Sequence, residues 1–476
     1  MSELPIGWVR IPMSQACTIV RGVTYNKTES SDEPLLGYFP ILRANNIQAG
    51  NLLFSDLVYV PERCVAPDQL IKAGDVVVAM SSGSKSVVGK AAKAESDWEG
   101  SFGAFCGVLR PSNEINPRYF YFFTQSAEYR TRVSELSAGV NINNLKPSHF
   151  ELIEVAIAPR AEQTRIAAKL DELLAQVDTL KARIDGIPAL LKRFRQSVLA
   201  AAVSGRLTEE WRARNVGWVD EWSPTTAQAS SLLPVSWSSK TAGNICGFIT
   251  KGTTPSKEKM TAGHGEVPYI KVYNLTFSGA LDFSIDPTFV DINTHSTELK
   301  RSIVKPGDVL MNIVGPPLGK VSIVPTTYPE WNINQAIARF SAADGISPEY
   351  LALCLRTEEV LNHAVSRAKA TAGQFNLTLE ICRELPLPVP PEEEQTEIVR
   401  RVEQLFAFAD RLEARVTAAQ SRLNHLTQSI LAKAFRGELV PQDPNDEPAS
   451  VLLERIKAQR AAAPKAKRGR RAATLS

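Results

Sequence analysis

The chain of 476 residues contains few of the side chains on which metal sites and histidine catalysis depend. It has five histidines, and none of them forms an HExxH motif or another closely spaced pair. Its six cysteines are scattered without a CxxC spacing, which argues against a thiolate zinc site and favours a reduced, cytoplasmic compartment. The sequence therefore predicts no metal ion in this chain.

Membrane, secretion and catalytic signals are also missing. The chain has no apolar run of roughly 18 residues, and its N-terminus lacks the charged and apolar stretches of a secretory signal. The segments 83–90 and 315–320 have the wrong length for a phosphate-binding P-loop. Asn116-Pro117-Arg118-Tyr119 lacks the second proline of the tetrapeptide with which methyltransferases reach a target base, and it is typical of a helix start. We expect no catalytic centre in this chain.

Charge is spread evenly over most of the sequence. Residues 1–160 contain 15 Lys and Arg against 16 Asp and Glu, and residues 231–391 contain 14 of each, so charge alone does not indicate nucleic-acid binding. The positive excess lies mainly near the C-terminus, where the low-complexity end would be either a solvated tail or a phosphate-binding arm. Its basic residues are Lys465, Lys467, Arg468, Arg470 and Arg471.

The sequence is duplicated. Glu162-Gln163-Thr164 recurs as Glu394-Gln395-Thr396, and QSVLAAAVSGRL (196–207) aligns with QSILAKAFRGEL (428–439), in both cases 232 residues later. Upstream of these segments the similarity is looser, as between LIKAGDVVV (70–78) and SIVKPGDVL (302–310). Each half therefore consists of a divergent module followed by a well-kept segment, and a pseudo-twofold molecule is predicted.

The two well-kept segments carry apolar residues at alternating spacings of four and three, which is typical of a left-handed coiled-coil seam. We predict one long helix in each half, ending at Gly205 and Gly437 and paired antiparallel, with a kink at Gly186-Ile187-Pro188 in the first. The alternative is that each helix is a core helix of its own module. The seam positions include Ile166, Leu173, Leu180, Leu191, Ile398, Leu405, Leu412 and Leu423.

The divergent modules read as short strands separated by turns, each closed by one short helix near 119–132 or 350–364. Regular alternation of strand and helix is missing, so a doubly wound sheet is not expected and the fold class is α+β, with an irregular, mostly β sheet. The predicted organisation is two divergent modules (1–160 and 231–391), two helical regions (161–207 and 392–439), a linker (208–230) and a basic low-complexity tail (440–476).

Several motifs occur in the same order in both halves and carry a family resemblance. They are GTTP (252–255), KPGDVL (305–310), GK (319–320), PLPVPPEEEQTEIV (386–399) and, in the first half, IAPRAEQTRI (157–166). Together with the duplicated heptad segments, they resemble the DNA-specificity subunit of type I restriction–modification enzymes. The first half departs from this pattern at VTYN (23–26), which lacks the TP of the second half.

The resemblance implies that each module is a target recognition domain reading one half of a split sequence in double-stranded DNA. It implies that the paired helices set the gap between the half-sites and dock two methyltransferase subunits and, through them, restriction and motor subunits. S-adenosylmethionine, ATP and Mg would then belong to those partners, and no cofactor to this chain. Two alternatives stay open: a specificity subunit serving one fused restriction–methylation partner, and a coiled-coil scaffold with two protein-binding modules.

Candidate DNA contacts are polar side chains that follow predicted strands, because Arg and Lys read guanine and Asn and Gln read adenine. The alternative for each is that Asn and Ser only form turns. In the first module the candidates are Arg43, Asn45, Asn46, Ser82, Lys85, Lys90, Asn141, Asn143, Asn144 and Lys146. In the second module they are Thr253, Thr254, Lys257, Lys271, Asn274, Asn312, Lys320, Gln374 and Asn376.

Overall fold

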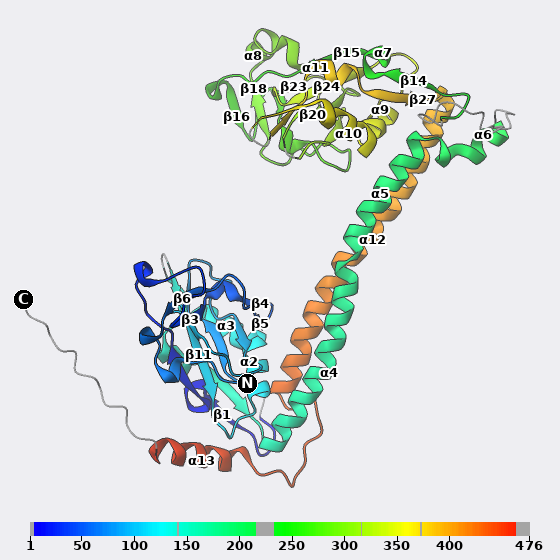
Figure 1. Cartoon of the computed structure of the whole chain (residues 1–476). Helices are drawn as coiled ribbons and strands as arrows, with labels where there is room; N and C mark the ends of the chain where they lie inside the picture. Colours follow the sequence, from blue (N-terminus) through cyan, green and yellow to red (C-terminus); the bar gives the residue numbers. More distant parts are fainter. Residues whose placement is uncertain (1–3, 140–141, 216–232, 316, 372–373, 463–476) are drawn as a thin grey trace, which may run out of the picture. The chain divides into compact units, whose positions relative to one another are not determined.

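The computed structural model describes residues 4–139, 142–215, 233–315, 317–371 and 374–462 (Figure 1). The chain divides into two compact units: unit 1 comprises Met1–Asp185 and Ala418–Ser476, and unit 2 comprises Gly186–Thr417. Each unit contains a β-rich module (module 1 and module 2) and a section of paired helices. Among the described residues, no helix combines the length and the apolar character that crossing a membrane requires.

Module 1 contains two main sheets. The first is antiparallel with strand order β2-β11-β7-β9 (Cys17–Arg21, Cys106–Pro111, Val76–Ala79 and Ala91–Lys93). The second has the order β10-β3-β6 (Ser101–Phe102, Tyr38–Leu42 and Val58–Pro61), with β10 parallel to β3. The apolar run of β7 is buried at all four positions, because it lies inside its sheet and is covered on both faces.

Short elements complete module 1. The two-stranded pairs are β1 with β13 (Val9–Pro12 and Glu154–Ile157), β8 with β12 (Ser81–Ser82 and Asn143–Asn144), and β4 with β5 (Ile47–Gln48 and Asn51–Leu52). The helices are α1, α2 and α3 (Met13–Ala16, Pro117–Gln125 and Ala127–Leu136). Asn116 caps α2, as its motif predicted, while Ser126 starts a second helix by accepting from the Tyr129 amide. The single helix expected at 119–132 is therefore two helices.

Module 2 repeats this plan. Its antiparallel sheet has the order β15-β24-β20-β22 (Cys246–Lys251, Ile337–Ala342, Val309–Asn312 and Val321–Ile323). Its second sheet has the order β16-β18-β17-β23-β19 (Met260–Ala262, Thr288–Val290, Val267–Ile270, Trp331–Ile333 and Ile303–Val304). Smaller sheets join β14 to β27 (Ser238–Thr241 and Pro386–Val389) and order β21-β26-β25 (Val314–Gly315, Gln374–Asn376 and Lys369–Thr371). The predicted α+β class with irregular, mostly β modules is confirmed.

The helices of module 2 are α7 to α11 (Ala242–Ile245, Ile292–Ser296, Pro348–Leu355, Glu358–Arg367 and Leu379–Arg383). Thr357 separates α9 from α10 and caps α10 by accepting from the Val360 amide. The helix expected at 350–364 is thus also divided in two. The same local cause acts in both modules, because a hydroxyl side chain at this position satisfies the first amides of a new helix.

The two well-kept segments form long helices. The first segment is α4 (Arg160–Asp185) followed by α5 (Ile187–Val203), and the second is α12 (Glu392–Phe435), which contributes residues to both units. The first is interrupted at Gly186, the position of the predicted kink, and Pro188 lies in the first turn of α5. Gly205 and Gly437 follow the helix ends in the left-handed conformation, with φ of 77° and 74°, as predicted.

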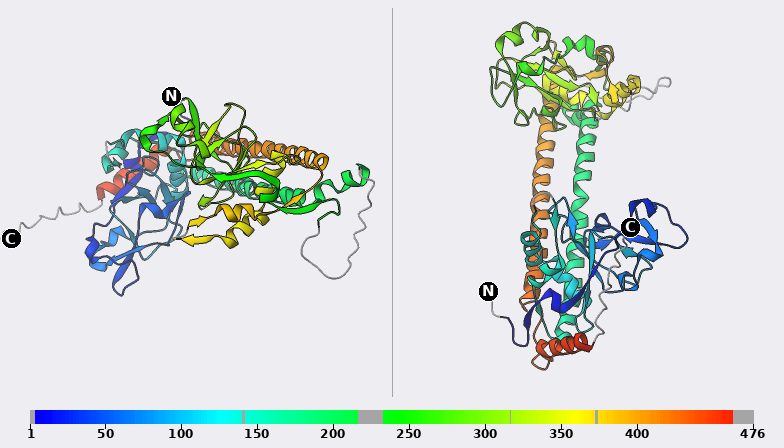
Figure 2. Two further views of the ribbon diagram at one scale, coloured as in Figure 1. Left: turned by 90° about the horizontal axis from the view of Figure 1, so that it is seen from above. Right: turned by 90° about the vertical axis from the view of Figure 1, so that its left-hand side faces the viewer.

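The helices pair antiparallel within each unit. In unit 1, Ile166 near the start of α4 shares a core with Leu431 near the end of α12, while Gln420 donates to Asp185 at 2.7 Å. In unit 2, Val198 of α5 shares a core with Ile398. Figure 2 shows these helices side by side in both views. The predicted antiparallel pair is confirmed, and the alternative of two unpaired core helices is excluded.

Most of the predicted seam positions are covered. Ile166, Leu191 and Ile398 are buried, and the half-buried positions are Leu173, Leu405, Leu412 and Leu423. Leu180 is the correction, because it is 47% exposed and belongs to none of the core clusters of the described residues. A seam formed by only two helices leaves one side of a leucine in solvent wherever no module covers it.

Two predicted boundaries need correction. Residues 208–215 are not linker, because η6 (Arg206–Thr208) and α6 (Glu209–Asn215) place Thr208 and Arg212 in the interior of unit 2. The predicted low-complexity tail contains α13 (Ala449–Ala462), whose apolar residues at helical spacing pack into the core of unit 1. The alanine- and arginine-rich composition of this segment hid the helix. The five basic residues from Lys465 to Arg471, and residues 216–230 of the predicted linker, lie outside the described residues.

Candidate nucleic-acid interface

Three segments of module 1 leave the sheets side by side at one edge. The Gly103 amide donates to the Leu42 carbonyl at 2.9 Å, and the Val23 amide donates to the Phe102 carbonyl at 2.7 Å. These bonds bring together the segments that follow β2, β3 and β10. The strand ends therefore place Thr24, Arg43 and Phe105 in neighbouring loops, which we call strand-end loops.

Module 2 uses the same hydrogen bonds at the corresponding positions. The Asn334 amide donates to the Ile270 carbonyl at 3.1 Å, and the Thr253 amide donates to the Ile333 carbonyl at 3.2 Å. Lys271 therefore corresponds to Arg43. Two modules with different loop sequences thus share one backbone frame at this edge.

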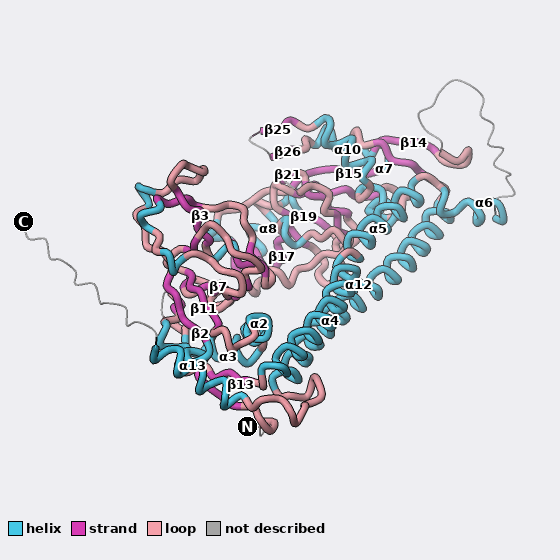
Figure 3. The backbone as a smooth tube through the Cα atoms, turned by 60° about the horizontal axis from the view of Figure 1, so that its bottom comes forward, coloured by secondary structure: helices cyan, strands magenta, loops and turns pink. Residues whose placement is uncertain are grey.

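The polar loops near residues 82 and 143, which are far apart in the sequence, are neighbours in module 1. β8 pairs with β12, and the Leu145 amide donates to the Met80 carbonyl at 2.7 Å. In module 2, β21 pairs with β26 and the Leu377 amide donates to the Ile313 carbonyl at 2.9 Å. Figure 3 shows β21, β25 and β26 together in module 2. Asn144 and Asn376 occupy corresponding positions in the two modules.

Most of the predicted contact residues reach the surface. In module 1 the exposed ones are Asn45, Lys85, Lys90, Asn144 and Lys146, and the half-buried ones are Arg43, Ser82 and Asn143. In module 2 the exposed ones are Thr253, Thr254, Lys257 and Asn376, and the half-buried ones are Lys271 and Lys320. Gln374 is placed by its backbone in β26, and Asn141 lies outside the described residues.

Asn46 and Asn274 are buried and act as structural caps. Asn46 donates to the carbonyls of Leu53 (2.9 Å) and Ser55 (2.7 Å) and accepts from the Arg43 amide (2.8 Å). Asn274 makes the same three bonds in module 2, with Asp282, Ile285 and Lys271. Both amide groups are used within the protein, so we remove these residues from the set of base contacts.

Asn312 is a third correction. It is fully buried, donates to the carbonyls of Val314 (3.3 Å) and Pro317 (2.9 Å), and accepts from the Lys320 amide (2.9 Å). This side chain therefore shapes the loop that carries Lys320 and is not presented to DNA. Residue type alone could not separate these buried amides from exposed ones, because asparagine is favoured in turns whether its side chain bonds to the backbone or faces solvent.

Replacing Asn46 by alanine is expected to lower the free energy of unfolding of unit 1 by about 2–4 kcal/mol, because three hydrogen bonds of a buried side chain are lost. The base preference of the folded protein should stay the same. Chemical denaturation of the variant gives the first quantity, and DNA binding at a temperature below its transition gives the second. Asn144→Ala, which removes an exposed amide of the same module, is the matched control and should leave stability unchanged.

Several residues of this surface were missed by sequence reasoning. Phe105 is 69% exposed, and its carbonyl accepts from the amides of Met80 (2.8 Å) and Ser81 (3.1 Å). Gln335 is exposed in the corresponding loop of module 2. Asp56 and Asp286 also lie in these loops. A search for hydrogen-bond donors that follow strands could not select an isolated aromatic residue or an acid.

A groove of about 490 Å³ lies between the end of β2 and residues 144–148 in module 1. Its polar lining includes Arg21, Thr24, Asn144 and Lys146, and its lining residues include no carboxylate. A groove with two cations, an amide and two hydroxyls suits a phosphate group or the edge of a base. The strand-end loops are therefore chemically suited to nucleic acid.

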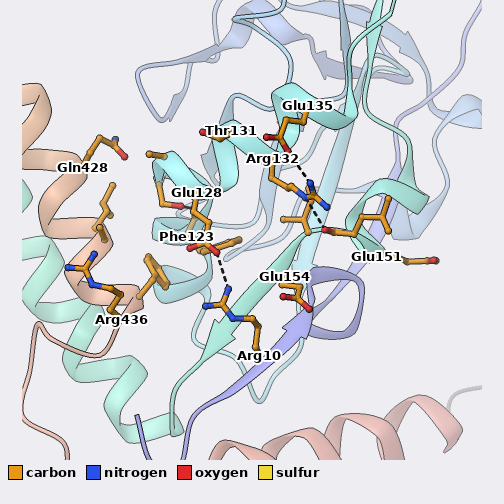
Figure 4. Close-up of a pocket in the computed structure, with 17 residues that line it drawn as sticks. Arg10, Phe123, Glu128, Thr131, Arg132, Glu135, Glu151, Glu154, Gln428 and Arg436 are labelled. Carbon is orange, nitrogen blue, oxygen red and sulfur yellow. Dashed lines mark hydrogen bonds and ion pairs between the residues drawn. The ribbon is translucent and has the colours of Figure 1, made fainter. Parts of the chain in front are cut away.

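The larger hollow of unit 1, about 890 Å³, has a different character (Figure 4). Its lining includes three arginines and four glutamates. Arg10 is paired with Glu128 at 3.0 Å, and Arg132 is paired with Glu135 at 3.0 Å, so much of the positive charge is already neutralised. A phosphate backbone would meet more negative than positive charge here, and this hollow is not a nucleic-acid site.

Two modules that present different side chains on one shared frame, joined to an antiparallel helical pair, are the architecture of a DNA-specificity subunit. The chain matches the family model described as "Type I restriction modification DNA specificity domain" over residues 5–189 and 234–419. It belongs to this family, the specificity subunits of type I restriction–modification systems, which are non-catalytic DNA-recognition subunits.

Relatives match along nearly the whole chain. The chain is 42% identical to the Type I restriction enzyme EcoKI specificity subunit of Escherichia coli (strain K12), covering 97% of both chains. It is 40% identical to the Type I restriction enzyme StySPI specificity subunit of Salmonella potsdam, covering 96% of both.

Two solved structures share the fold. One comes from work on complex assembly and conformational transition of the type I R-M system (TM-score 0.65, 18% identity, 92% of this chain and 100% of the other). The second is the HsdS subunit from Thermoanaerobacter tengcongensis (TM-score 0.52, 18% identity, 92% and 99%).

Proposed function

We propose that this chain binds a split sequence in double-stranded DNA, with each module reading one half-site through its strand-end loops. One observation carries the proposal. The two modules keep the same backbone hydrogen bonds at this edge, while exposed side chains such as Asn45 and Tyr273 differ between them. Two domains that bind different base sequences in the same way need a shared backbone arrangement and different side chains at the DNA surface.

The candidate contacts divide by their chemistry. Exposed amides such as Asn144 and Asn376 are suited to base edges, whereas the lysines are suited to phosphates. Because both modules are nearly neutral overall, affinity for DNA of any sequence should be weak in the isolated chain. Strong binding would then require the partner subunits, which is consistent with a chain that works inside a larger complex.

We propose that the helical pair sets the gap between the half-sites. α12 has 44 residues, which corresponds to about 66 Å of helix, and its seam holds it to α4 and α5. The proposed complex contains two methyltransferase subunits and, through them, restriction and motor subunits in the cytoplasm. S-adenosylmethionine, ATP and Mg belong to those partners. A fused restriction–methylation partner would be compatible with the same geometry.

Two lysines at corresponding positions test the proposed surface. Lys90 and Lys320 directly precede β9 and β22. Replacing either by alanine in the reconstituted complex should weaken binding to all DNA sequences alike and reduce the slope of log affinity against log salt by about 1. Equilibrium binding at several salt concentrations measures both effects.

Lys72 provides the control, because it is an exposed lysine near the start of β7, at the opposite end of that strand from Lys90. Its replacement by alanine should leave the salt slope unchanged. An equal effect of Lys72→Ala and Lys90→Ala would remove the strand-end loops as the DNA surface. Failure of the wild-type complex to bind DNA would favour the scaffold alternative.

A further inference from the structure

A matched cluster of three polar side chains occurs in the strand-end loops of both modules. In module 1, Asp56 Oδ2 accepts from Arg43 Nη2 (2.9 Å) and from Asn45 Nδ2 (2.9 Å). In module 2, Asp286 Oδ2 accepts from the Tyr273 hydroxyl and lies 3.4 Å from Lys271 Nζ. Each cluster therefore joins one cation and one neutral side chain to a single carboxylate oxygen.

The clusters occupy corresponding positions. Each follows the strand that ends at Leu42 or Ile270, and each cation precedes a short helical turn, η2 (Ala44–Asn46) or η8 (Val272–Asn274), whose last residue is the buried Asn described above. Arg43 thus corresponds to Lys271, and Asn45 corresponds to Tyr273. The aspartate is the one side chain that is identical in the two clusters.

The aspartates are held in an unfavourable backbone conformation. Their φ values are 54° for Asp56 and 47° for Asp286, in the left-handed region, which non-glycine residues adopt at a cost of about 1–2 kcal/mol. The buried Asn fixes the preceding residue in each loop, by bonding to the carbonyl of Ser55 or Ile285. The carboxylate side chains are 75% and 60% exposed, so the ion pairs contribute little to stability.

The hydrogen bonds to the aspartate determine which donors and acceptors its two partner side chains can still offer to DNA. Arg43 uses Nη2 for the carboxylate, and among the described residues Nη1 makes no hydrogen bond. Asn45 retains its carbonyl oxygen and one N–H. The Tyr273 hydroxyl donates its hydrogen bond to Asp286. Its oxygen can therefore act only as an acceptor toward a further group.

We propose that Asp56 and Asp286 are positioning residues and that residues 45 and 273 determine base preference, one in each half-site. The inference rests on the proposed function. Asn45, with one donor and one acceptor, matches the N7 and amino group of adenine. Tyr273, with an acceptor alone, selects a base that presents an amino group in the major groove, adenine or cytosine. An aspartate at corresponding positions thus orients Asn45 in module 1 and Tyr273 in module 2.

Selection from a randomised duplex by the intact complex with its methyltransferase partner tests the inference. Asp56→Asn and Asp286→Asn keep the side-chain shape, and asparagine tolerates the left-handed backbone. Each should reduce discrimination at one base position about tenfold, in one half-site only, while affinity for non-specific DNA stays equal or rises, because a negative charge is removed beside the DNA. Tyr273→Phe, which removes the acceptor and keeps the ring, should affect the same position as Asp286→Asn. Glu151→Gln and Asp344→Asn remove exposed carboxylates elsewhere and should change nothing.

Three outcomes would overturn the inference: unchanged preference in the aspartate variants, an equal loss at all positions, or a loss in both half-sites. Thermal melting of each variant shows whether its loop still folds, since preference measured on a protein with the wild-type transition cannot reflect misfolding. A wild-type complex that selects no sequence would instead refute the proposed function. The two failures are therefore distinguishable.

Discussion

A chain that ends after Pro448 is expected to lose the stable fold of unit 1. The deletion removes α13, whose residues Ala449, Leu452 and Ile456 are buried in the core of module 1. Loss of a buried Leu or Ile side chain costs about 2–5 kcal/mol, so two of them approach the whole stability of an average domain. Arg460 adds to the loss, because it donates to the carbonyls of Ser14 and Cys17 at 2.8 and 2.9 Å.

Calorimetry of the full chain and of the shortened chain measures this effect, and the transition of unit 1 should disappear or fall below that of unit 2. Point variants of the same helix separate core packing from chain length. Leu452→Ala should lower the free energy of unfolding by about 2–5 kcal/mol, whereas Val451→Ala, at a 39% exposed position, should change it by less than about 0.5 kcal/mol. Equal effects of the two substitutions would show that α13 is not part of the core.

Arg212→Met is expected to destabilise unit 2 by about 3–5 kcal/mol, because it leaves a buried carboxylate without its cation. Glu394 Oε1 accepts from Arg212 Nη1 (2.6 Å) and from the Thr208 hydroxyl (2.7 Å), and Oε2 accepts from Trp237 Nε1 (2.8 Å). Glu394 is 0% exposed and Arg212 is 6% exposed. The transition temperature of unit 2 should fall by roughly 6–20 °C, since 1 kcal/mol corresponds to a few degrees at this size.

Glu162 of unit 1 is the matched control. It accepts from Trp8 Nε1 at 2.9 Å, as Glu394 does from Trp237, but its Oε1 has no partner among the described residues. Burial raises the pKa of Glu162 above its ordinary value. The folded state therefore binds this proton more tightly than the unfolded state, and stability from this group is lost as pH rises from the ordinary glutamate pKa through the raised one.

Glu162→Gln should consequently raise the free energy of unfolding of unit 1 at neutral pH. It should also reduce the dependence of that free energy on pH above the ordinary glutamate pKa. Glu394→Gln should destabilise unit 2, because it removes the charge that Arg212 requires. Melting curves recorded across this pH range test both expectations. Stabilisation by Glu394→Gln, or a loss of stability in Glu162→Gln at neutral pH, would contradict the account of the two carboxylates.

The duplicated fold could be predicted largely from the sequence. The 4–3 spacing predicted both helices and their pairing, because a seam of this period needs a partner of the same period. Gly186-Ile187-Pro188 predicted the interruption, and Asn116 predicted the start of α2. The repeat of Glu-Gln-Thr is visible in the sequence, but the sequence does not show what these residues contact. In the structure its glutamate binds a tryptophan, and Gln163 and Gln395 each accept from a module backbone amide at 2.8 Å.

The parts that could not be predicted depend on tertiary contacts. α13 has 14 residues, but which of them are buried becomes visible only once module 1 is folded. Asn46, Asn274 and Asn312 look like surface amides in the sequence, since only the folded loop encloses them. Asp56 and Asp286 carry no signal of their own. Asp56 and Asp286 correspond because they lie in loops that follow equivalent strands. The sequences of the two modules do not reveal this, because the number of residues between corresponding positions varies along the modules.

Selection of a randomised duplex by the wild-type complex is the measurement that tests the central claim most directly. We expect a recognised sequence in two parts with a constant gap, and we expect Asn376→Ala in module 2 to change only one of those parts. A single continuous sequence, or a change in both parts on altering one module, would contradict it.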